Sequence, residues 1–295
     1  MMKSEGSKIL CFGEVLWDML PTGEKPGGAP MNVALHLKNF GLDVAMVSKT
    51  GNDEHGRMLI EFMRGSGLNT DLIFKDEMLE TSKVLVHIDG QHASFEICEP
   101  VAWDNITLSD ELVQIADGCN YIVYGSLASR NIKTRKTLQN LLRKDMIKIM
   151  DVNLRPPYTD SEVIIPLLKK ADILKLNDEE IMTIGSWFNQ NDTIPQLMKW
   201  IAKEMELKAV SVTRGEQGAL LYQNGRLYVH KGYKVNAFDP VGAGDAFLAG
   251  YIYSLISEKV PEESLDYACA TGALVASKNG ATPSYSQLEI ENIRQ

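Results

Sequence analysis

The sequence predicts an α/β protein built on a doubly wound, mostly parallel sheet with helices on both faces, that is, a three-layer architecture. Short apolar segments rich in β-branched residues alternate along the chain with longer segments of helical periodicity. This alternation is typical of parallel βαβ units. Most of the apolar segments are continuous and do not alternate with polar residues, as in strands that are covered on both faces.

The elements follow in chain order from this pattern. In the first expected helix, Val33, Leu37 and Phe40 are spaced as on one helical face. The segments expected to form strands of the large sheet are 8–12, 44–48, 121–124, 147–152, 173–176 and 209–213. The later segments expected to form helices are 54–67, 134–144, 193–204, 246–256 and 264–278.

The segment 83–98 breaks the alternation, because it is typical of a β-hairpin. Asp89-Gly90 is a favoured two-residue turn, and a turn there pairs Val84 with Phe95 and places apolar partners on one face. An isolated two-stranded sheet is only marginally stable, so this face needs a cover from segment 14–20, a second subunit or a ligand. Both interpretations of this hairpin, a lid over a site and an edge hairpin without a further role, are compatible with the sequence.

Composition and charge exclude several classes of protein. The 295 residues are 44% hydrophobic and 23% charged, which is ordinary for a globular protein. With 30 Lys+Arg against 39 Asp+Glu, the net charge of -9 argues against nucleic-acid and membrane partners, which bind basic faces. The apolar segment 9–12 is too short for a secretory signal, and 246–256 is too short to span a bilayer. We find no linker or repeat, so we expect one domain.

Cysteine and histidine usage indicates neither a disulfide framework nor a metal site. The histidines are scattered without metal-ligand spacing, and no Cys-x-x-Cys pair is present. We expect free, buried thiols and a reducing, cytoplasmic setting. The cysteines are Cys11, Cys98, Cys119 and Cys269.

The segment 239–251, Asp-Pro-Val-Gly-Ala-Gly-Asp-Ala-Phe-Leu-Ala-Gly-Tyr, carries the clearest chemical signal. Gly242 and Gly244 precede a helical pattern, and the free amides of a helix start bind anions when small residues allow close approach. A phosphoryl group suits such a site, because its transfer depends on positioning and charge stabilisation. Asp245 would repel a resting phosphate, yet it can accept a proton from an attacking hydroxyl. Helix capping is the alternative.

A second signal lies at 27–34, Gly-Gly-Ala-Pro-Met-Asn-Val-Ala. The glycines lead into a helix with proline in its first turn, and the Asn32 amide can both donate to and accept from sugar hydroxyls. Capping again is the alternative. Segment 51–58 lacks the Lys-Ser/Thr ending of a P-loop. Neither a Gly-x-Gly-x-x-Gly after the first strand nor a Gly-x-Ser-x-Gly elbow occurs, which argues against dinucleotide-binding oxidoreductases and α/β-hydrolases.

Together, Gly27-Gly-x-x-x-Asn32 and Asp239-x-x-Gly-Ala-Gly-Asp245 resemble the two signatures of the PfkB (ribokinase-like) family of carbohydrate kinases. The resemblance extends over nearly the whole chain, from Gly13-Glu14 to segment 280–284. With the later Asp151-x-Asn-x-Arg155, the first signature is most similar to that of bacterial fructokinases.

The resemblance implies a ribokinase-like fold and an ATP- and Mg²⁺-dependent sugar kinase, most similar to a fructokinase. One α/β domain is expected over residues 1–295, with a small β-sheet lid formed by the inserted segments 14–26 and 82–101. The apolar face of this lid is expected to pair with a second copy, giving a homodimer.

The resemblance also implies a role for each matching residue. Asp245 is similar to the catalytic base that deprotonates the sugar hydroxyl. Residues similar to the anion hole for the γ-phosphoryl group are Gly242, Ala243 and Gly244. Residues expected at the sugar are Asp18, Gly28, Asn32 and Arg155. Those expected at the nucleotide are Asn177, Glu180, Thr213 and Gly215, with Glu180 also near Mg²⁺ through water. Asp239 and the loop 280–284 resemble a monovalent-cation site, which would hold K⁺.

Three other functions stay open from the sequence. One is a kinase for another small hydroxylated substrate: 2-keto-3-deoxygluconate, ribose or a nucleoside. Leu16 argues against ribose, because ribokinases carry asparagine at the matching position. The others are a non-catalytic sugar-binding relative and a Rossmann oxidoreductase.

Overall fold

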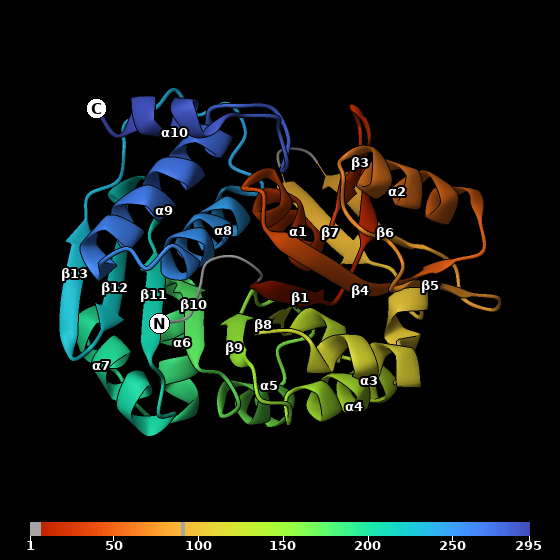
Figure 1. Ribbon diagram of the computed structural model, residues 1–295, viewed down its shortest axis with the longest axis horizontal. Coiled ribbons are helices and arrows are strands. Elements are labelled where there is room, and N and C mark those ends of the chain that lie inside the picture. The colour runs from red at the N-terminus through yellow and green to blue at the C-terminus, as the bar shows by residue number, and fades with distance from the viewer. Residues whose placement is uncertain (1–6, 90–91) are drawn as a thin grey trace.

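The structure is a computed structural model that describes residues 7–89 and 92–295, and its main feature is a large, mostly parallel sheet (Figure 1). Its strands, with those of a small separate sheet, are β1 Lys8–Phe12, β2 Leu16–Leu20, β3 Gly23–Gly27, β4 Asp43–Gly51, β5 Ile73–Asp76, β6 Ser82–Asp89, β7 His92–Ile97, β8 Tyr121–Gly125, β9 Ile147–Asp151, β10 Ile173–Asn177, β11 Ala209–Thr213, β12 Ala219–Gln223 and β13 Arg226–His230. The α-helices are α1 Ala29–Asn39, α2 Glu54–Gly65, α3 Asp110–Asp117, α4 Ile132–Leu141, α5 Ser161–Leu168, α6 Asp178–Trp187, α7 Ile194–Glu204, α8 Ala243–Ile256, α9 Pro261–Ala276 and α10 Gln287–Ile293.

Within the described ranges, nine strands form the large sheet in the order β13-β12-β11-β10-β9-β8-β1-β4-β5. Neighbouring strands are parallel, except that β12 runs antiparallel to both β11 and β13. Strand β1 pairs with β4 on one side and with β8 on the other. The chain therefore continues to opposite sides of β1, and ligands bind at such switch points, beyond the carboxyl ends of the strands.

Helices cover both faces of this sheet, as expected for a three-layer α/β fold. Along β1, Ile9 and Cys11 belong to a hydrophobic cluster with residues of α1, α2, α8 and α9, whereas Leu10 and Phe12 belong to a second cluster with residues of α3 to α7. Successive side chains of a strand point to opposite faces, so each face of β1 contacts a different helical layer. In Figure 1, α1, α8 and α9 lie on one side of the sheet and α3 to α7 on the other.

The expected strands and helices all occur, but several boundaries differ and some elements were not predicted. Strand β4 continues to Gly51, and α9 begins at Pro261, three residues before the expected start. Helix α6 was missed although the sequence carries a signal for its start: Asn177, the last residue of β10, caps the helix, and Glu180 three residues later completes a capping box. The antiparallel pair β12–β13 was also missed. Strand β13 lies at the edge of the sheet and is only half-buried, so it lacks a continuous apolar run.

The small sheet has the order β3-β2-β6-β7 among the described residues. The hairpin is therefore not an isolated two-stranded sheet, because β6 pairs with β2, which in turn pairs with β3. The predicted register was wrong by two residues: Val84 pairs with Ile97 and not with Phe95, because Asp89 pairs with His92 and does not belong to the turn. Gly90, the other expected turn residue, lies outside the described part.

The remaining expectations concern cysteines and membranes. The four cysteines are free; Cys98 is only half-buried, whereas the other three are buried. In the part of the chain that the structure describes, we find no helix with the length and apolar character needed to cross a membrane.

A buried ion pair anchors the chain where it returns from the small sheet. The Arg130 guanidinium donates to both carboxylate oxygens of Asp104, each at 2.8 Å, and to the Cys98 carbonyl oxygen at 2.8 Å. It lies between the rings of Trp103 and Tyr158, 4.0 and 4.7 Å from their centroids. Cys98 directly follows β7, so this contact fixes the base of the small sheet against the large one.

We expect Arg130→Met to lower the free energy of unfolding by about 3–5 kcal/mol, because it leaves the Asp104 carboxylate buried without its counter-ion. Urea denaturation measures this change. Arg57→Met is the matched control: Arg57 pairs with Glu54 and Glu61 on the exposed face of α2, and its loss should change stability little. Equal effects of the two substitutions would contradict the anchoring role of Arg130.

Candidate active site

The predicted glycine-rich segment forms the start of α8, at the carboxyl edge of the large sheet. Gly242 is the N-cap, with φ 79°, and a Cβ atom there would collide with the Ala281 backbone, so the position requires glycine. The Ala243 amide donates to the Pro240 carbonyl oxygen at 3.2 Å. The Gly244 amide lies in the first turn, where helix geometry provides no intrahelical acceptor. This amide is therefore available to an anion.

Asn32 and Asp245 meet across two helices. Asn32 lies in α1, and its Nδ2 donates to Asp245 Oδ2 at 2.8 Å. The capping alternative for Asn32 is wrong, because Gly28 is the N-cap of α1 and no side chain caps it. Gly28 has φ 117°, and a Cβ atom there would lie 2.5 Å from the Glu14 carbonyl oxygen. The Asn32 Oδ1 atom is buried and has no hydrogen-bond partner within the described ranges, so it can accept from a ligand.

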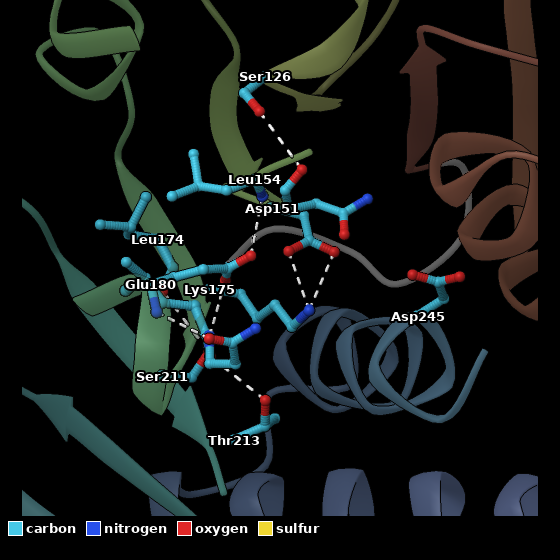
Figure 2. Close-up of polar contacts among 12 residues, drawn as sticks. Ser126, Asp151, Leu154, Leu174, Lys175, Glu180, Ser211, Thr213 and Asp245 are labelled. Carbon is cyan, nitrogen blue, oxygen red and sulfur yellow. Dashed lines mark hydrogen bonds and ion pairs between the residues drawn. The ribbon is translucent and has the colours of Figure 1, made fainter. Parts of the chain in front are cut away.

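A buried lysine lies beneath the start of α8. Lys175 Nζ donates to both carboxylate oxygens of Asp151, at 2.9 and 3.1 Å, as Figure 2 shows. A Cβ atom on Gly244 would lie 3.1 Å from this nitrogen, so the ammonium group is directly beside the helix start. Burial lowers the pKa of Lys175, but Asp151, Glu180 and Asp245 together outweigh burial, so the net shift is upward and the group stays charged.

Lys175 was not predicted as a site residue, although the sequence carries a signal for it. The residue interrupts an apolar run that was expected to be a buried strand, and a buried charge must be paired. Such a lysine predicts a carboxylate on a neighbouring strand. The partner is Asp151, at the end of the adjacent β9.

Burial raises the pKa values of several carboxyl groups of the site, most clearly those of Asp245 and Glu14. Burial, together with the nearby Asp151, raises the pKa of Asp245 to about 6, opposed by Lys175, the Asn32 hydrogen bond and Arg155. Asp245 is thus mostly ionised at neutral pH and able to accept a proton.

Glu14, which follows β1 and is 2% exposed, was also missed as a site residue. Burial raises its pKa to about 7; Arg155 opposes this shift, and Asp245 and Asp151 add to it. Its Oε2 atom has no hydrogen-bond partner among the residues described.

The residues expected at the sugar gather on the side of the small sheet. Asp18 lies on β2, where a Cβ atom on Gly27 would come within 2.5 Å of its Oδ2. Burial raises the pKa of Asp18, and Arg155 opposes that shift. Arg155 is exposed and donates to the Leu154 carbonyl oxygen at 3.1 Å. Its positive charge favours the ionised forms of Glu14, Asp18 and Asp245.

Asn177 and Glu180 form a reciprocal cap at the start of α6. Asn177 Oδ1 accepts from the Glu180 amide and Glu180 Oε2 accepts from the Asn177 amide, both at 2.8 Å. Glu180 Oε1 accepts from the Leu154 amide at 2.9 Å, which ties α6 to the loop that carries Arg155 (Figure 2). Glu180 is buried, and burial together with Asp151 raises its pKa, opposed by Lys175 and the two amides. Both residues therefore have a structural role at the start of α6.

A pocket of about 690 Å³ opens beside the same helix start. Thr213 and Gly215 line it, as expected, together with Ala243, Gly244 and the Phe247 ring. Most of the remaining lining residues come from the loop after β13 and from α9: Gly232, Tyr233, Lys234, Val235, Ala237, Pro240, Cys269, Gly272, Ala273 and Ala276. This wall is mainly apolar, with few polar side chains, as is typical of small-molecule sites. Gly244 thus separates this pocket from the carboxylate-rich side of the site.

Asp239 organises the loop that precedes α8. Its Oδ1 accepts from the Val241 amide at 3.1 Å and its Oδ2 from the Gly280 amide at 3.2 Å. It therefore joins the segment before α8 to the expected cation loop. No cluster of three or more His, Cys, Asp or Glu side chains in the described ranges is arranged to hold a metal ion.

Comparisons with known proteins agree with this architecture. A sugar kinase of Pyrococcus horikoshii is 30% identical over 308 aligned residues, which cover 95% of this chain and 94% of that protein. Fructokinase-1 of Zea mays is also 30% identical, over 94% of each chain. The fructokinase of Xylella fastidiosa, solved with bound ATP, has a TM-score of 0.86 over 98% of each chain; at 24% identity it shows the shared fold alone.

The pfkB family of carbohydrate kinases matches residues 7–288 of this sequence, which is nearly the whole chain. The match includes both glycine-rich segments, the Lys175–Asp151 pair and the pocket beside α8. The chain therefore belongs to the pfkB family of carbohydrate kinases.

Proposed function

We propose that this sugar kinase transfers the γ-phosphoryl group of ATP to a hydroxyl group of fructose. The observation that carries the proposal is the position of Asp245. It lies at the start of α8, hydrogen-bonded to Asn32, between the apolar pocket and the carboxylate-rich side of the site. A proton acceptor with a pKa of about 6 is thus next to an anion-binding helix start, which is the arrangement that phosphoryl transfer to an alcohol needs.

Each group has a defined task in the proposed reaction. Asp245 accepts the proton of the sugar hydroxyl while the hydroxyl oxygen forms a bond to the γ-phosphorus and the bond to the leaving ADP oxygen breaks. The turn formed by Gly242, Ala243 and Gly244 makes the anion hole, in which the Gly244 amide is the donor available to the phosphoryl group because the Ala243 amide donates to Pro240. The Lys175 ammonium beside Gly244 adds positive charge where negative charge accumulates. The Asn32 amide holds the carboxylate of Asp245 in place.

The nucleotide would occupy the 690 Å³ pocket, with Thr213 and Gly215 along its wall and the phosphates toward Gly244. Asn177 and Glu180 would lie at the triphosphate end. The Glu180 carboxylate supplies the hard oxygen donors that Mg²⁺ prefers, and Mg²⁺ keeps several waters when it binds through few carboxylates and phosphates. Bound there through water, the ion would neutralise part of the phosphate charge.

Three further assignments belong to the proposal. The single domain of residues 1–295 carries the small sheet as a lid, which would close over the sugar and exclude water. Pairing of two such lids would form a homodimer. Asp239 and the loop 280–284 would hold K⁺ through backbone carbonyl oxygens, and the enzyme would act in the cytoplasm.

Charge at the acceptor side favours a neutral sugar over a sugar acid. Glu14, Asp18 and Asp245 line this side, and the exposed Arg155 is the cation that acts on all three. A substrate carboxylate, as in 2-keto-3-deoxygluconate, would face this acidic set at a cost in binding energy. Fructose has no such group, and the fructokinase relatives act on the sugar that their names state.

A coupled ADP-release assay over a panel of acceptors tests the function. We expect the highest kcat/KM for fructose among fructose, ribose, 2-keto-3-deoxygluconate and a nucleoside, with the Asp245→Asn enzyme as the blank. A preference for one of the other three would replace fructose as the acceptor. No ADP release above the blank with any of them would overturn the kinase assignment.

We expect Asp245→Asn to lower kcat by about 10²- to 10⁴-fold, because the general base is lost, while the fold stays intact. In the wild-type enzyme, kcat/KM should fall with decreasing pH below about 6, since burial raises the pKa of Asp245 and only its ionised form accepts the proton. A pH profile from 5 to 8 measures this. An acidic limb that persists in Asp245→Asn would exclude Asp245 as its origin.

We expect Asp18→Ala to raise the KM for the sugar by about 10- to 100-fold and to leave the KM for ATP unchanged, because a hydrogen bond to a charged group is lost. Steady-state kinetics with each substrate varied in turn measure both constants. Glu24→Ala, which removes an exposed carboxylate from the neighbouring β3, should change neither constant. An unaltered sugar KM in Asp18→Ala would remove Asp18 from the site.

A further inference from the structure

The backbone of Gly242 rests directly on a loop from the end of the chain. A Cβ atom on Gly242 would collide with the Ala281 carbonyl oxygen and would lie 2.6 Å from the Ala281 Cα. Gly242 also has a left-handed backbone conformation, with φ 79°, which residues other than glycine rarely adopt. Any displacement of Ala281 therefore changes the position of the helix start that carries Gly244 and Asp245.

A buried histidine holds Ala281 in place. His36 lies in α1 and is 2% exposed, and its Nε2 is 3.0 Å from the Ala281 carbonyl oxygen. Its Nδ1 is 2.8 Å from the Tyr285 hydroxyl. A carbonyl oxygen can only accept, so Nε2 carries the proton and Nδ1 accepts from Tyr285. Burial lowers the pKa of His36 to about 4, opposed by the bond to Ala281, so the ring stays neutral and keeps this tautomer at neutral pH.

The other hydrogen bonds that hold this loop are made by residues before and after Ala281. Asp239 accepts from the Gly280 amide, before Ala281, and Asn39 Nδ2 donates to the Tyr285 carbonyl oxygen, after it. Within the described ranges, the side chain that hydrogen-bonds to Ala281 itself is the His36 ring.

His36 also shares a helix face with the residue that holds the base. Asn32 lies one turn before His36, and side chains four residues apart lie on the same side of a helix. Asn32 bonds to Asp245, whereas His36 bonds to the loop behind Gly242. One face of α1 therefore contacts both the carboxylate and the backbone on which the anion hole rests.

We propose that His36 is a positioning residue for phosphoryl transfer: it fixes Ala281, and through Ala281 the Gly242 backbone, so that α1 sets the anion hole and Asp245 relative to each other. His36 itself touches no substrate in this assignment. The inference rests on the proposed function in that it takes the start of α8 as the site of the terminal phosphate. A purely structural histidine would instead contribute to stability alone.

Three substitutions separate these roles. Glutamine can donate to Ala281 and accept from Tyr285, as the neutral imidazole does, whereas asparagine is one methylene shorter and leucine makes neither bond. Tyr285→Phe removes only the bond at Nδ1, and Asn39→Ala loosens the loop beyond Ala281; both serve as controls. Thermal unfolding of every variant identifies a temperature at which all are folded, and all measurements are made there.

We expect His36→Asn and His36→Leu to lower kcat for the sugar by about 10- to 100-fold, the scale on which small misplacements of reacting groups act. The KM for the sugar should be nearly unchanged, and His36→Gln, Tyr285→Phe and Asn39→Ala should retain most of the wild-type kcat. If folded His36→Asn and His36→Leu have wild-type kcat, or if His36→Gln is as impaired as His36→Leu, the positioning role is wrong.

Calorimetry with MgATP and MgADP separates this inference from the proposed function, because it needs no turnover. The terminal phosphate is present only in ATP, so His36→Asn should bind ATP about tenfold more weakly while its affinity for ADP stays unchanged. Equal changes for both nucleotides, or none, would overturn the proposal. Absence of sugar-dependent ADP release in the wild-type enzyme would instead contradict the proposed function. The ratio of the ATP affinity to the ADP affinity would still test the positioning role of His36.

Discussion

The hydrogen bond from Asn32 to Asp245 is the contact on which the rest of the site depends. It joins α1 and α8, which come from opposite ends of the sequence and lie on the same side of the large sheet. Both helices begin at glycines with positive φ. In each case another backbone segment also lies where a Cβ atom would be, so both positions require glycine. The glycines of the two signatures therefore allow the two helix starts to come close enough for Asn32 and Asp245 to form this hydrogen bond.

Charge in the site is balanced locally. Asp151 is fully engaged by Lys175, whereas Asp245 and Glu14 are enclosed without a dedicated cation of their own, and burial shifts their pKa values upward. The lysine lies beside Gly244, at the end of the site where anions would bind, and the uncompensated carboxyl groups lie toward the small sheet. In the proposed reaction, this division would separate a phosphate-binding side from a hydroxyl-binding side across one helix start, and it is why we assign proton acceptance to Asp245.

The topology of the sheet explains why these groups gather where they do. Glu14 follows the carboxyl end of β1, Asp151 ends β9, Lys175 lies near the end of β10, and the chain diverges on either side of β1. Parallel strands present their carboxyl ends at one edge, so side chains distant in sequence meet there. The small sheet, which carries Asp18, is inserted at the same edge, and the buried Arg130 anchors its base.

The sequence by itself determined the alternation of strands and helices, the positions of both glycine signatures and the residue types suited to phosphoryl transfer, because these depend on local periodicity and on backbone conformations that only glycine adopts readily. It could not determine the register of β6 with β7, where a local turn signal competes with the pairing of whole strands. Nor did it indicate the contacts of Lys175, Glu14 and His36. Each of these side chains is buried against partners from distant segments, so its hydrogen bonds and its pKa are fixed only when the sheet and the helices assemble around it.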